Sequence, residues 1–105
     1  MIRYNVTVTV QKTDFNEWIG WMKSKHIPDV LETGLFESCE IQRHLNDEND
    51  SVVTVTFSYQ CQSLESLEMY QSEYARALQK EHTERYAGKF KANRVVAAIE
   101  GRLVK

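Results

Sequence analysis

The chain has 105 residues, of which 42% are hydrophobic and 27% charged, and its formal net charge is −2 at pH 7. This length is sufficient for one domain around a single core, and the composition is typical of a globular protein. No apolar run approaches the roughly 18–20 residues of a membrane-spanning helix, and the start lacks the basic and apolar regions of a signal peptide. We therefore expect a single domain over residues 1–105 that resides in the cytoplasm.

The charge is distributed unevenly along the chain. Residues 80–105 contain 7 Lys or Arg and 3 Asp or Glu, so this part is basic and the remainder is acidic. Lys89, Lys91 and Arg94 could bind an anion or a nucleic acid, although charges of this kind more often form a solvated surface.

The cysteines and histidines do not predict a metal site. Cys39 and Cys61 form no CxxC pair, and we expect two buried, reduced thiols on separate strands. An iron–sulfur cluster would require four thiolates. His26, His44 and His82 share no spacing typical of metal ligands, so we expect neither a metal nor a cofactor.

The first strand is predicted by a strict alternation of apolar and polar side chains over residues 1–11. Residues 51–61 alternate in the same way. Between them, residues 35–45 are predicted to form a strand with Cys39 and Ile41 inward, and the polar turn 46–50 predicts a hairpin. The inward sets of the two alternating strands are Ile2, Tyr4, Val6, Val8 and Val10, and Val53, Val55, Phe57, Tyr59 and Cys61.

The first helix is predicted to begin after Thr13 or Asp14, with Glu17 in the capping-box position. It should end near His26, because Pro28 cannot continue a helix but can open a short further turn over residues 28–33. Gly34 would then end that turn in the left-handed conformation.

A second helix is predicted after Ser63, with Ser66 as an alternative cap, and Gly88 should end it. A last strand over residues 91–99 follows. The buried stripe of this helix is predicted to contain Leu64, Leu67, Tyr70, Tyr74, Ala75, Leu78 and His82.

The order βαββαβ predicts a ferredoxin-like α+β fold: a four-stranded antiparallel sheet in the order 4-1-3-2, with two helices on one face. The other face carries Thr7, Thr54 and Thr56, and it is either open to water or packed on a second sheet across a dimer. RNA-recognition motifs with this topology place aromatic residues where this chain has threonines, so we do not expect nucleic acid binding.

His26 is the principal candidate functional residue. At about 100° per residue it shares a helical sector with Phe15, Trp18, Ile19 and Met22, so it should face inward. The predicted topology places it near Tyr4 and Tyr59 and places His82 at the opposite end, which argues against a His26/His82 pair. A neutral imidazole beside two phenols can act on a small ligand, but a core histidine bonded to a tyrosine hydroxyl is the simpler interpretation.

Two tryptophans lie on the same predicted helix as His26. Trp18 is central to the apolar stripe, and both Trp18 and Trp21 are most simply explained as core residues. Because Trp21 lies at the edge of the stripe, it could also line a pocket mouth or a dimer contact.

The chain resembles a family of short bacterial proteins known only as a domain of unknown function. The resemblance covers nearly the whole length, and His26 and Tyr4 fall within its motifs. More loosely, the His-x-Pro turn followed by Gly-Leu-Phe is similar to dimeric α+β barrel proteins, which include small monooxygenases and isomerases. This similarity implies a homodimer whose sheets pack face to face, with a pocket between sheet and helices. The matching segments are residues 1–7, 18–22, 26–30, 33–36 and 88–90.

Three hypotheses remain. The first is a dimer that binds a small molecule or a partner, with His26, Tyr4, Tyr59, Trp18 and Trp21 as the predicted ligand-binding residues. The second is a cofactor-independent enzyme, similar to a monooxygenase or an isomerase, that uses His26 with Tyr4 or Tyr59. The third is an anion or nucleic-acid binder. The absence of a second strong acid or base beside His26 favours the first.

Overall fold

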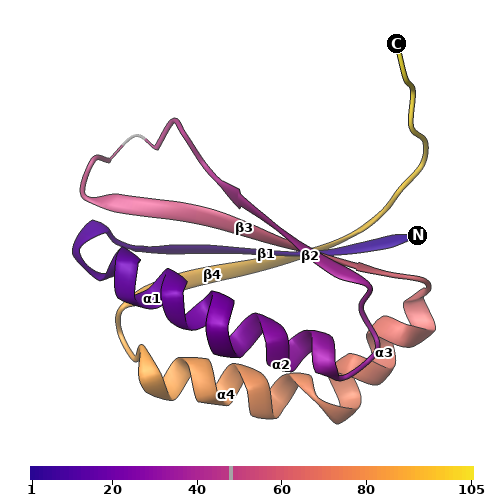
Figure 1. The fold of residues 1–105 in the computed structure, drawn as a ribbon, viewed down its shortest axis with the longest axis horizontal. Helices are drawn as coiled ribbons and strands as arrows, with labels where there is room; N and C mark the ends of the chain where they lie inside the picture. The colour runs from indigo at the N-terminus through magenta and orange to yellow at the C-terminus, as the bar shows by residue number, and fades with distance from the viewer. Residues whose placement is uncertain (48) are drawn as a thin grey trace.

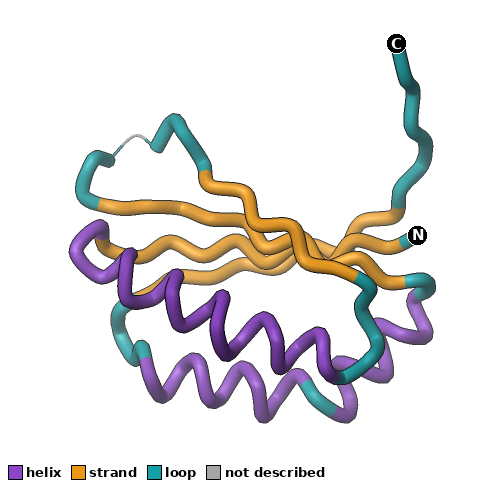
Figure 2. Tube along the Cα trace, viewed as in Figure 1, coloured by secondary structure: helices purple, strands orange, loops and turns teal. Residues whose placement is uncertain are grey.

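A four-stranded antiparallel sheet with helices against one face forms the fold of this computed structural model, which describes residues 1–47 and 49–105 (Figure 1, Figure 2). The strand order β2-β3-β1-β4 is the predicted order written from the other edge, so the ferredoxin-like prediction is confirmed. The strands are β1 (Ile2–Gln11), β2 (Ser38–Arg43), β3 (Val52–Cys61) and β4 (Phe90–Ala98). The helical segments are the 3₁₀ turn η1 (Lys12–Asp14), α1 (Phe15–Trp21), the π-helical η2 (Met22–His26), α2 (Ile27–Glu32), α3 (Leu64–Glu73) and α4 (Ala75–Arg85).

The two central strands follow the predicted alternation. β1 pairs with β3 in a register that places Tyr4 opposite Tyr59 and Val8 opposite Val55. All five predicted inward residues of β3 are buried, and Phe57 is only 1% exposed. Apolar side chains on one face of both strands therefore fix which face the helices cover.

The first helical segment (residues 15–32) continues past Pro28, so the prediction that this residue stops the helix is wrong. α1, η2 and α2 follow one another without a break (Figure 1). In η2 the backbone N–H of Ile27 donates to the carbonyl of Met22, five residues earlier, which inserts one extra residue into the turn. Pro28 then lies in the first turn of α2, where a missing N–H costs little. Gly34 ends the segment with a φ of 78°, as predicted.

The predicted capping box at the start of the first helical segment does not form. Asp14 precedes α1, but its side chain accepts no capping hydrogen bond. Glu17 instead accepts hydrogen bonds from Arg85 at 2.8 Å and from the Tyr86 hydroxyl at 2.7 Å. A tertiary contact between α1 and the C-terminal end of α4 therefore replaces the local cap.

The second helical segment (α3 and α4) begins as predicted, because the Ser63 side chain accepts a hydrogen bond from the Ser66 backbone N–H at 3.2 Å. It is then interrupted at Tyr74, which has a φ of −128°, so one predicted helix becomes α3 and α4. Leu64 is 54% exposed and Tyr74 41% exposed, and their predicted burial is wrong. Leu64 lies in the first turn of α3 at the end of the sheet, and one helical period does not persist across the break at Tyr74.

The edge strand β2 is shorter than the predicted 35–45. The chain first crosses from α2 to the sheet, and Phe36 packs into the core, 4.8 Å from the Tyr70 ring. Cys39 is half-buried, while Ile41 is 38% exposed although it lies opposite Phe57, because this edge of the sheet is incompletely covered. Residue 48 of the predicted hairpin turn lies outside the described residues.

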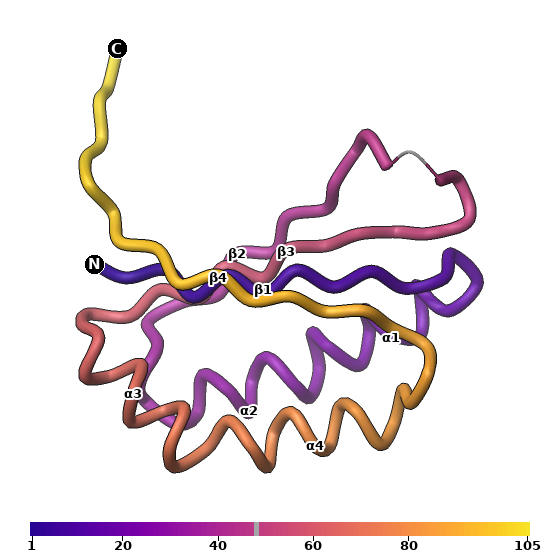
Figure 3. Tube along the Cα trace, turned by 180° about the vertical axis from the view of Figure 1, so that it is seen from behind, coloured from indigo at the N-terminus to yellow at the C-terminus, as the bar shows by residue number. Residues whose placement is uncertain are grey.

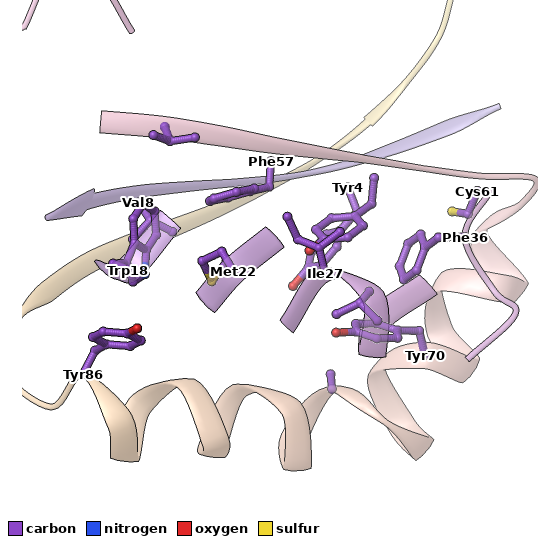
Figure 4. Packing of buried hydrophobic residues seen from close by; sticks show 14 of the residues in the cluster. Tyr4, Val8, Trp18, Met22, Ile27, Phe36, Phe57, Cys61, Tyr70 and Tyr86 are labelled. Atoms are coloured by element: carbon purple, nitrogen blue, oxygen red, sulfur yellow. The ribbon is translucent and has the colours of Figure 1, made fainter. Parts of the chain in front are cut away.

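The core has two ends of different composition, which Figure 4 shows along the sheet. Tyr4, Phe36, Tyr59 and Tyr70 form an aromatic group at one end. Trp18, which is fully buried, packs against Phe57 at the other end. Aromatic rings occur at both ends, but the first end contains three tyrosines and the second contains an indole, so the ends differ in the polar groups that they carry.

The opposite face of the sheet is covered by no described helix (Figure 3). Hydroxyl pairs cross its two central strands: Thr7 and Thr56 are 2.8 Å apart, and Thr9 and Thr54 are 3.0 Å apart. Residues 99–105 extend away from the sheet on the side opposite the helices (Figure 1, Figure 3). Among the described residues, no helix has the length and apolar character needed to cross a membrane.

Candidate functional site

Three adjoining cavities lie between the helices and the covered face of the sheet. The outer cleft, of about 460 Å³, lies between α4 and β4 with Tyr4 among its lining residues. The histidine cavity, of about 40 Å³, is lined by His26 and His82. The tyrosine cavity, of about 30 Å³, is lined by Tyr4, His26 and Tyr59. Gln79 and Arg94 line all three, so the cavities are neighbours within one region of the molecule.

His26 lies at the centre of this region, at the end of the π-helical segment. Its ring stacks on Trp21 with centroids 5.6 Å apart. Its Nδ1 atom is buried and has no hydrogen-bond partner among the described residues. Burial lowers the pKa of His26 to about 4, an effect opposed by the charge of Asp29 and reinforced by that of Arg94. The imidazole is therefore neutral at pH 7 and keeps an unsatisfied nitrogen beside the cavities.

His82 lies beside His26, so the prediction that the two histidines occupy opposite ends of the core is wrong. Their ring centroids are 5.8 Å apart. The predicted first helix ends at His26. In the structure the first helical segment continues to Glu32, so His26 lies within it and not at its end. From this position His26 lies beside His82 of α4, which runs antiparallel to the first helical segment.

Trp18 fixes the hydrogen-bonding state of His82. The indole Nε1–H donates to His82 Nε2 at 2.9 Å, so Nε2 must be unprotonated and the neutral ring carries its hydrogen on Nδ1. Burial lowers the pKa of His82 to about 4, and the proximity of His26 and Arg94 acts in the same direction. The site thus holds two neutral imidazoles, one with a fixed tautomer and one with a free nitrogen.

The predicted association of His26 with Tyr4 and Tyr59 is present in the structure, since all three line the tyrosine cavity. Tyr70 lines it as well, a residue that the helical pattern had suggested only as core. Burial raises the pKa of all three tyrosines above the ordinary value, and Arg94 opposes this effect at Tyr4. These phenols therefore stay protonated at neutral pH and serve as hydrogen-bond donors rather than bases.

The two tryptophans lie behind the histidines and do not line the three cavities. Trp18 supports His82, while Trp21 supports His26 and is itself covered by the Arg85 guanidinium at 5.3 Å. Their predicted contact with a ligand stays a prediction. Their observed role is to hold the two imidazoles in place.

Arg94 is the functional candidate whose position the sequence analysis missed. It was grouped with Lys89 and Lys91 as a basic surface, but the register of β4 places it opposite Val6 on the helix-covered face. Lys91 lies opposite Thr9 and hence on the other face, so these cations do not form one patch. The alternation of Phe90, Ala92, Arg94 and Val96 already contained this signal.

The arrangement suits the binding of an organic molecule better than that of a metal ion. Within residues 1–47 and 49–105, no group of three His, Cys, Asp or Glu side chains could hold a metal. The region instead offers a guanidinium, an amide, protonated phenols and neutral imidazoles. These groups can orient a polar ligand, and the unpartnered His26 nitrogen can accept or donate one hydrogen bond.

Solved structures share this fold at low sequence identity. A dimeric ferredoxin-like protein from an uncultured marine organism is 11% identical, with a TM-score of 0.67 and full coverage of both chains. At3g17210 from Arabidopsis thaliana is 11% identical, with a TM-score of 0.70, covering 99% of this chain and 100% of that one. The monooxygenase ActVA-Orf6 of Streptomyces coelicolor, solved with nanaomycin D, is 14% identical, with a TM-score of 0.61, covering 99% of this chain and 93% of that one.

These likenesses establish the ferredoxin-like fold and no reaction. A comparison with curated protein sequences finds no match. The family comparison is specific, because residues 1–98 match a single family along their whole length. The chain therefore belongs to the family described as Domain of unknown function (DUF4286).

Proposed function

We propose that this protein is a cytoplasmic homodimer that binds a small molecule between sheet and helices, with His26 at the inner end of the site. The main support is the unpartnered, buried Nδ1 of His26, a residue that lines two small cavities, which share Gln79 and Arg94 with the outer cleft. Buried polar atoms are almost always hydrogen-bonded, so one left without a partner beside a cavity suggests that a ligand supplies the partner.

The dimensions of the region are consistent with this function. An outer cleft of about 460 Å³ falls within the range of small-molecule sites. The inner cavities, of about 30 and 40 Å³, admit only a few atoms, so most of a ligand would lie in the cleft. A peptide or nucleic acid would require a longer groove.

The uncovered face of the sheet supports the homodimer. Its threonine hydroxyls are already paired within the subunit, so a second sheet could cover them without leaving those groups unsatisfied. The similar protein from an uncultured marine organism is described as dimeric. Cys39 and Cys61 are free thiols, which supports a reducing compartment such as the cytoplasm.

An enzyme without a cofactor is the second candidate. It is favoured by the neutral His26, whose free nitrogen could take a proton from a bound molecule while the Tyr4 or Tyr59 hydroxyl donates to an oxygen of that molecule. The similar protein of Streptomyces coelicolor is described as a monooxygenase. Catalysis requires that the ligand change chemically, and simple binding does not.

Native mass spectrometry of the protein purified from its own host tests binding directly. We expect a dimer that retains a small molecule, and we expect the His26→Ala variant to lose that molecule while Lys23→Ala, an exposed change in the same helical segment, retains it. A His26→Ala variant that is less stable but binds equally well would identify His26 as a core residue only. Incubating the identified molecule with the protein in air then separates binding from catalysis.

A further inference from the structure

The outer cleft has more positive than negative charge. Arg76, Lys80 and Arg94 line it, and Glu84 is the only carboxylate among its lining residues. Lys80 lies 3.7 Å from Glu84, so these two charges largely offset each other. Within residues 1–47 and 49–105, neither Arg76 nor Arg94 forms an ion pair. The cleft therefore presents two guanidinium groups without a counter-charge.

Arg94 occupies an unusual position among these cations. It lies on the helix-covered face of β4 opposite Val6, in a row that otherwise consists of Phe90, Ala92 and Val96. β4 is an edge strand and the Arg94 side chain is exposed, so its charge keeps access to solvent while it lies next to apolar side chains. At this position Arg94 lines the outer cleft and both inner cavities.

Two polar groups beside Arg94 can also donate hydrogen bonds. Gln79 lines the same three cavities, and Tyr4 lines two of them. The Tyr4 hydroxyl stays protonated, since burial raises its pKa, and the Gln79 amide can donate through its NH₂ group. Arg94 and Gln79 both lie within hydrogen-bonding range of the Tyr4 hydroxyl, so three donor groups are close together and can bind an acceptor with negative charge.

Apolar side chains become more frequent toward the inner end of the site. Ala75 and the Tyr4 ring contribute to the cleft, and Val6 and Met22 line both inner cavities. A ligand with a compact anionic group can therefore pair with Arg94 and place a few apolar atoms in the inner cavities. A planar carboxylate matches the two parallel N–H donors of one guanidinium, whereas a phosphate would favour a larger cluster of cations.

We propose that the ligand of this site is a small carboxylic acid with an apolar body, whose carboxylate is held by Arg94 together with Gln79 and the Tyr4 hydroxyl. This inference rests on the proposed binding function and adds to it the chemical class of the ligand. It also assigns Arg94 as the residue that determines specificity for the anion, with His26 facing the deeper end of the site.

Benzoate and its neutral isostere benzamide test the proposal as probes, in NMR titrations of the isotope-labelled full chain. We expect benzoate to shift the signals of Tyr4, Gln79 and Arg94 and to bind at least about tenfold more tightly than benzamide, because its charge is paired. Arg94→Gln should remove this preference, and Arg94→Lys should restore part of it. Lys23→Gln removes an exposed charge outside the site and should leave benzoate binding unchanged.

The other outcomes separate the two proposals. Equal binding of benzamide and benzoate, or benzoate binding that survives Arg94→Gln, overturns the carboxylate inference and leaves a site for small molecules. Inorganic phosphate that displaces benzoate and binds more tightly overturns it in favour of a phosphorylated ligand. If neither probe binds but the protein from its host holds a neutral molecule, only the carboxylate inference fails. If no small molecule is found by either experiment, both proposals fail. Circular dichroism of each variant establishes that a loss of binding does not reflect unfolding.

Discussion

The two faces of the sheet use the same strands for different purposes. On the covered face, β1 and β3 contribute large apolar and aromatic side chains, and Tyr4 and Tyr59 of these strands line the tyrosine cavity. On the open face, the same strands contribute threonines that bond to one another across the strand pair. One face thus provides stability and a candidate ligand site, whereas the other provides a polar surface for which we propose a second subunit. Each of the following predictions compares these faces, in decreasing order of the expected effect on folding.

Two neighbouring residues of β3 provide the strongest test. Phe57 is 1% exposed on the covered face, and Thr56 points to the open face, where it pairs with Thr7. Phe57→Ala should lower the free energy of unfolding by about 3–5 kcal/mol, because it removes buried area and leaves a cavity. Thr56→Ala should lower it by only about 1–2 kcal/mol, because it removes the partly exposed hydrogen bonds of this hydroxyl with Thr7 and His44.

Urea denaturation of both variants measures this difference. The slope of unfolding free energy against urea should be unchanged in both, which would show that the same surface is exposed on unfolding. Similar losses in the two variants would contradict the assignment of the core to one face.

The acid sensitivity of the protein should come partly from the histidines of the covered face. Burial lowers the pKa of both His26 and His82 to about 4 in the folded protein, whereas an unfolded histidine has a pKa of about 6.5. The unfolded chain therefore binds protons first, and the stabilising contribution of each neutral imidazole is complete above about pH 6.5. As the pH falls toward 4, each histidine should remove up to about 1.4 kcal/mol of stability per pH unit.

The variants His26→Gln and His82→Gln should each make the unfolding free energy less dependent on pH between 6.5 and 4. The carboxylates also titrate near the lower limit, so the difference between wild type and variant isolates the histidine contribution. NMR titration of the two imidazoles provides an independent measurement. An unchanged pH dependence in both variants, or folded pKa values near 6.5, would show that the imidazoles are more hydrated than the structure indicates.

The strands and their buried faces could be predicted because one period of two residues specifies both the element and the inward side chains. That period also placed Tyr4 and Tyr59 on the same face, where they line one cavity. The proximity of His82 to His26 could not be predicted, since it requires a helical segment that continues past His26 through a π-helical turn, and a single inserted residue has no recognisable pattern in the sequence. The π-helical turn also explains why Pro28 does not end the first helical segment.

Other parts of the site depended on tertiary contacts. Trp18 was correctly predicted as a central core residue, but its hydrogen bond to His82 joins residues 64 positions apart. Arg94 is different, because the alternation of β4 places it on the covered face. Its charge suggested an exposed position, which the structure has, but the alternation also places it on the face that carries the cavities.

The open face provides the last comparison, through a change that should affect folding little and association strongly. Thr7 lies on the central strand β1, and a glutamate at this position can still accept a hydrogen bond from the Thr56 hydroxyl. Thr7→Glu should therefore lower the free energy of unfolding of the chain by no more than about 1 kcal/mol. In a dimer whose sheets pack face to face, the same change buries a carboxylate from each subunit near the interface, where its desolvation is costly.

Sedimentation equilibrium at micromolar concentration should find a dimer for the wild type and a monomer for Thr7→Glu, while Lys23→Gln, which makes the net charge more negative by the same single unit on the exposed side of a helix, stays dimeric. A wild-type monomer, or a Thr7→Glu dimer as tight as the wild type, would show that the threonine face is a solvated surface. The covered face would keep its cavities in either case, because the residues that line them all belong to one subunit. Ligand binding and dimerisation are therefore separable, and a monomeric Thr7→Glu variant that still binds benzoate would show that the second subunit is not required for the site.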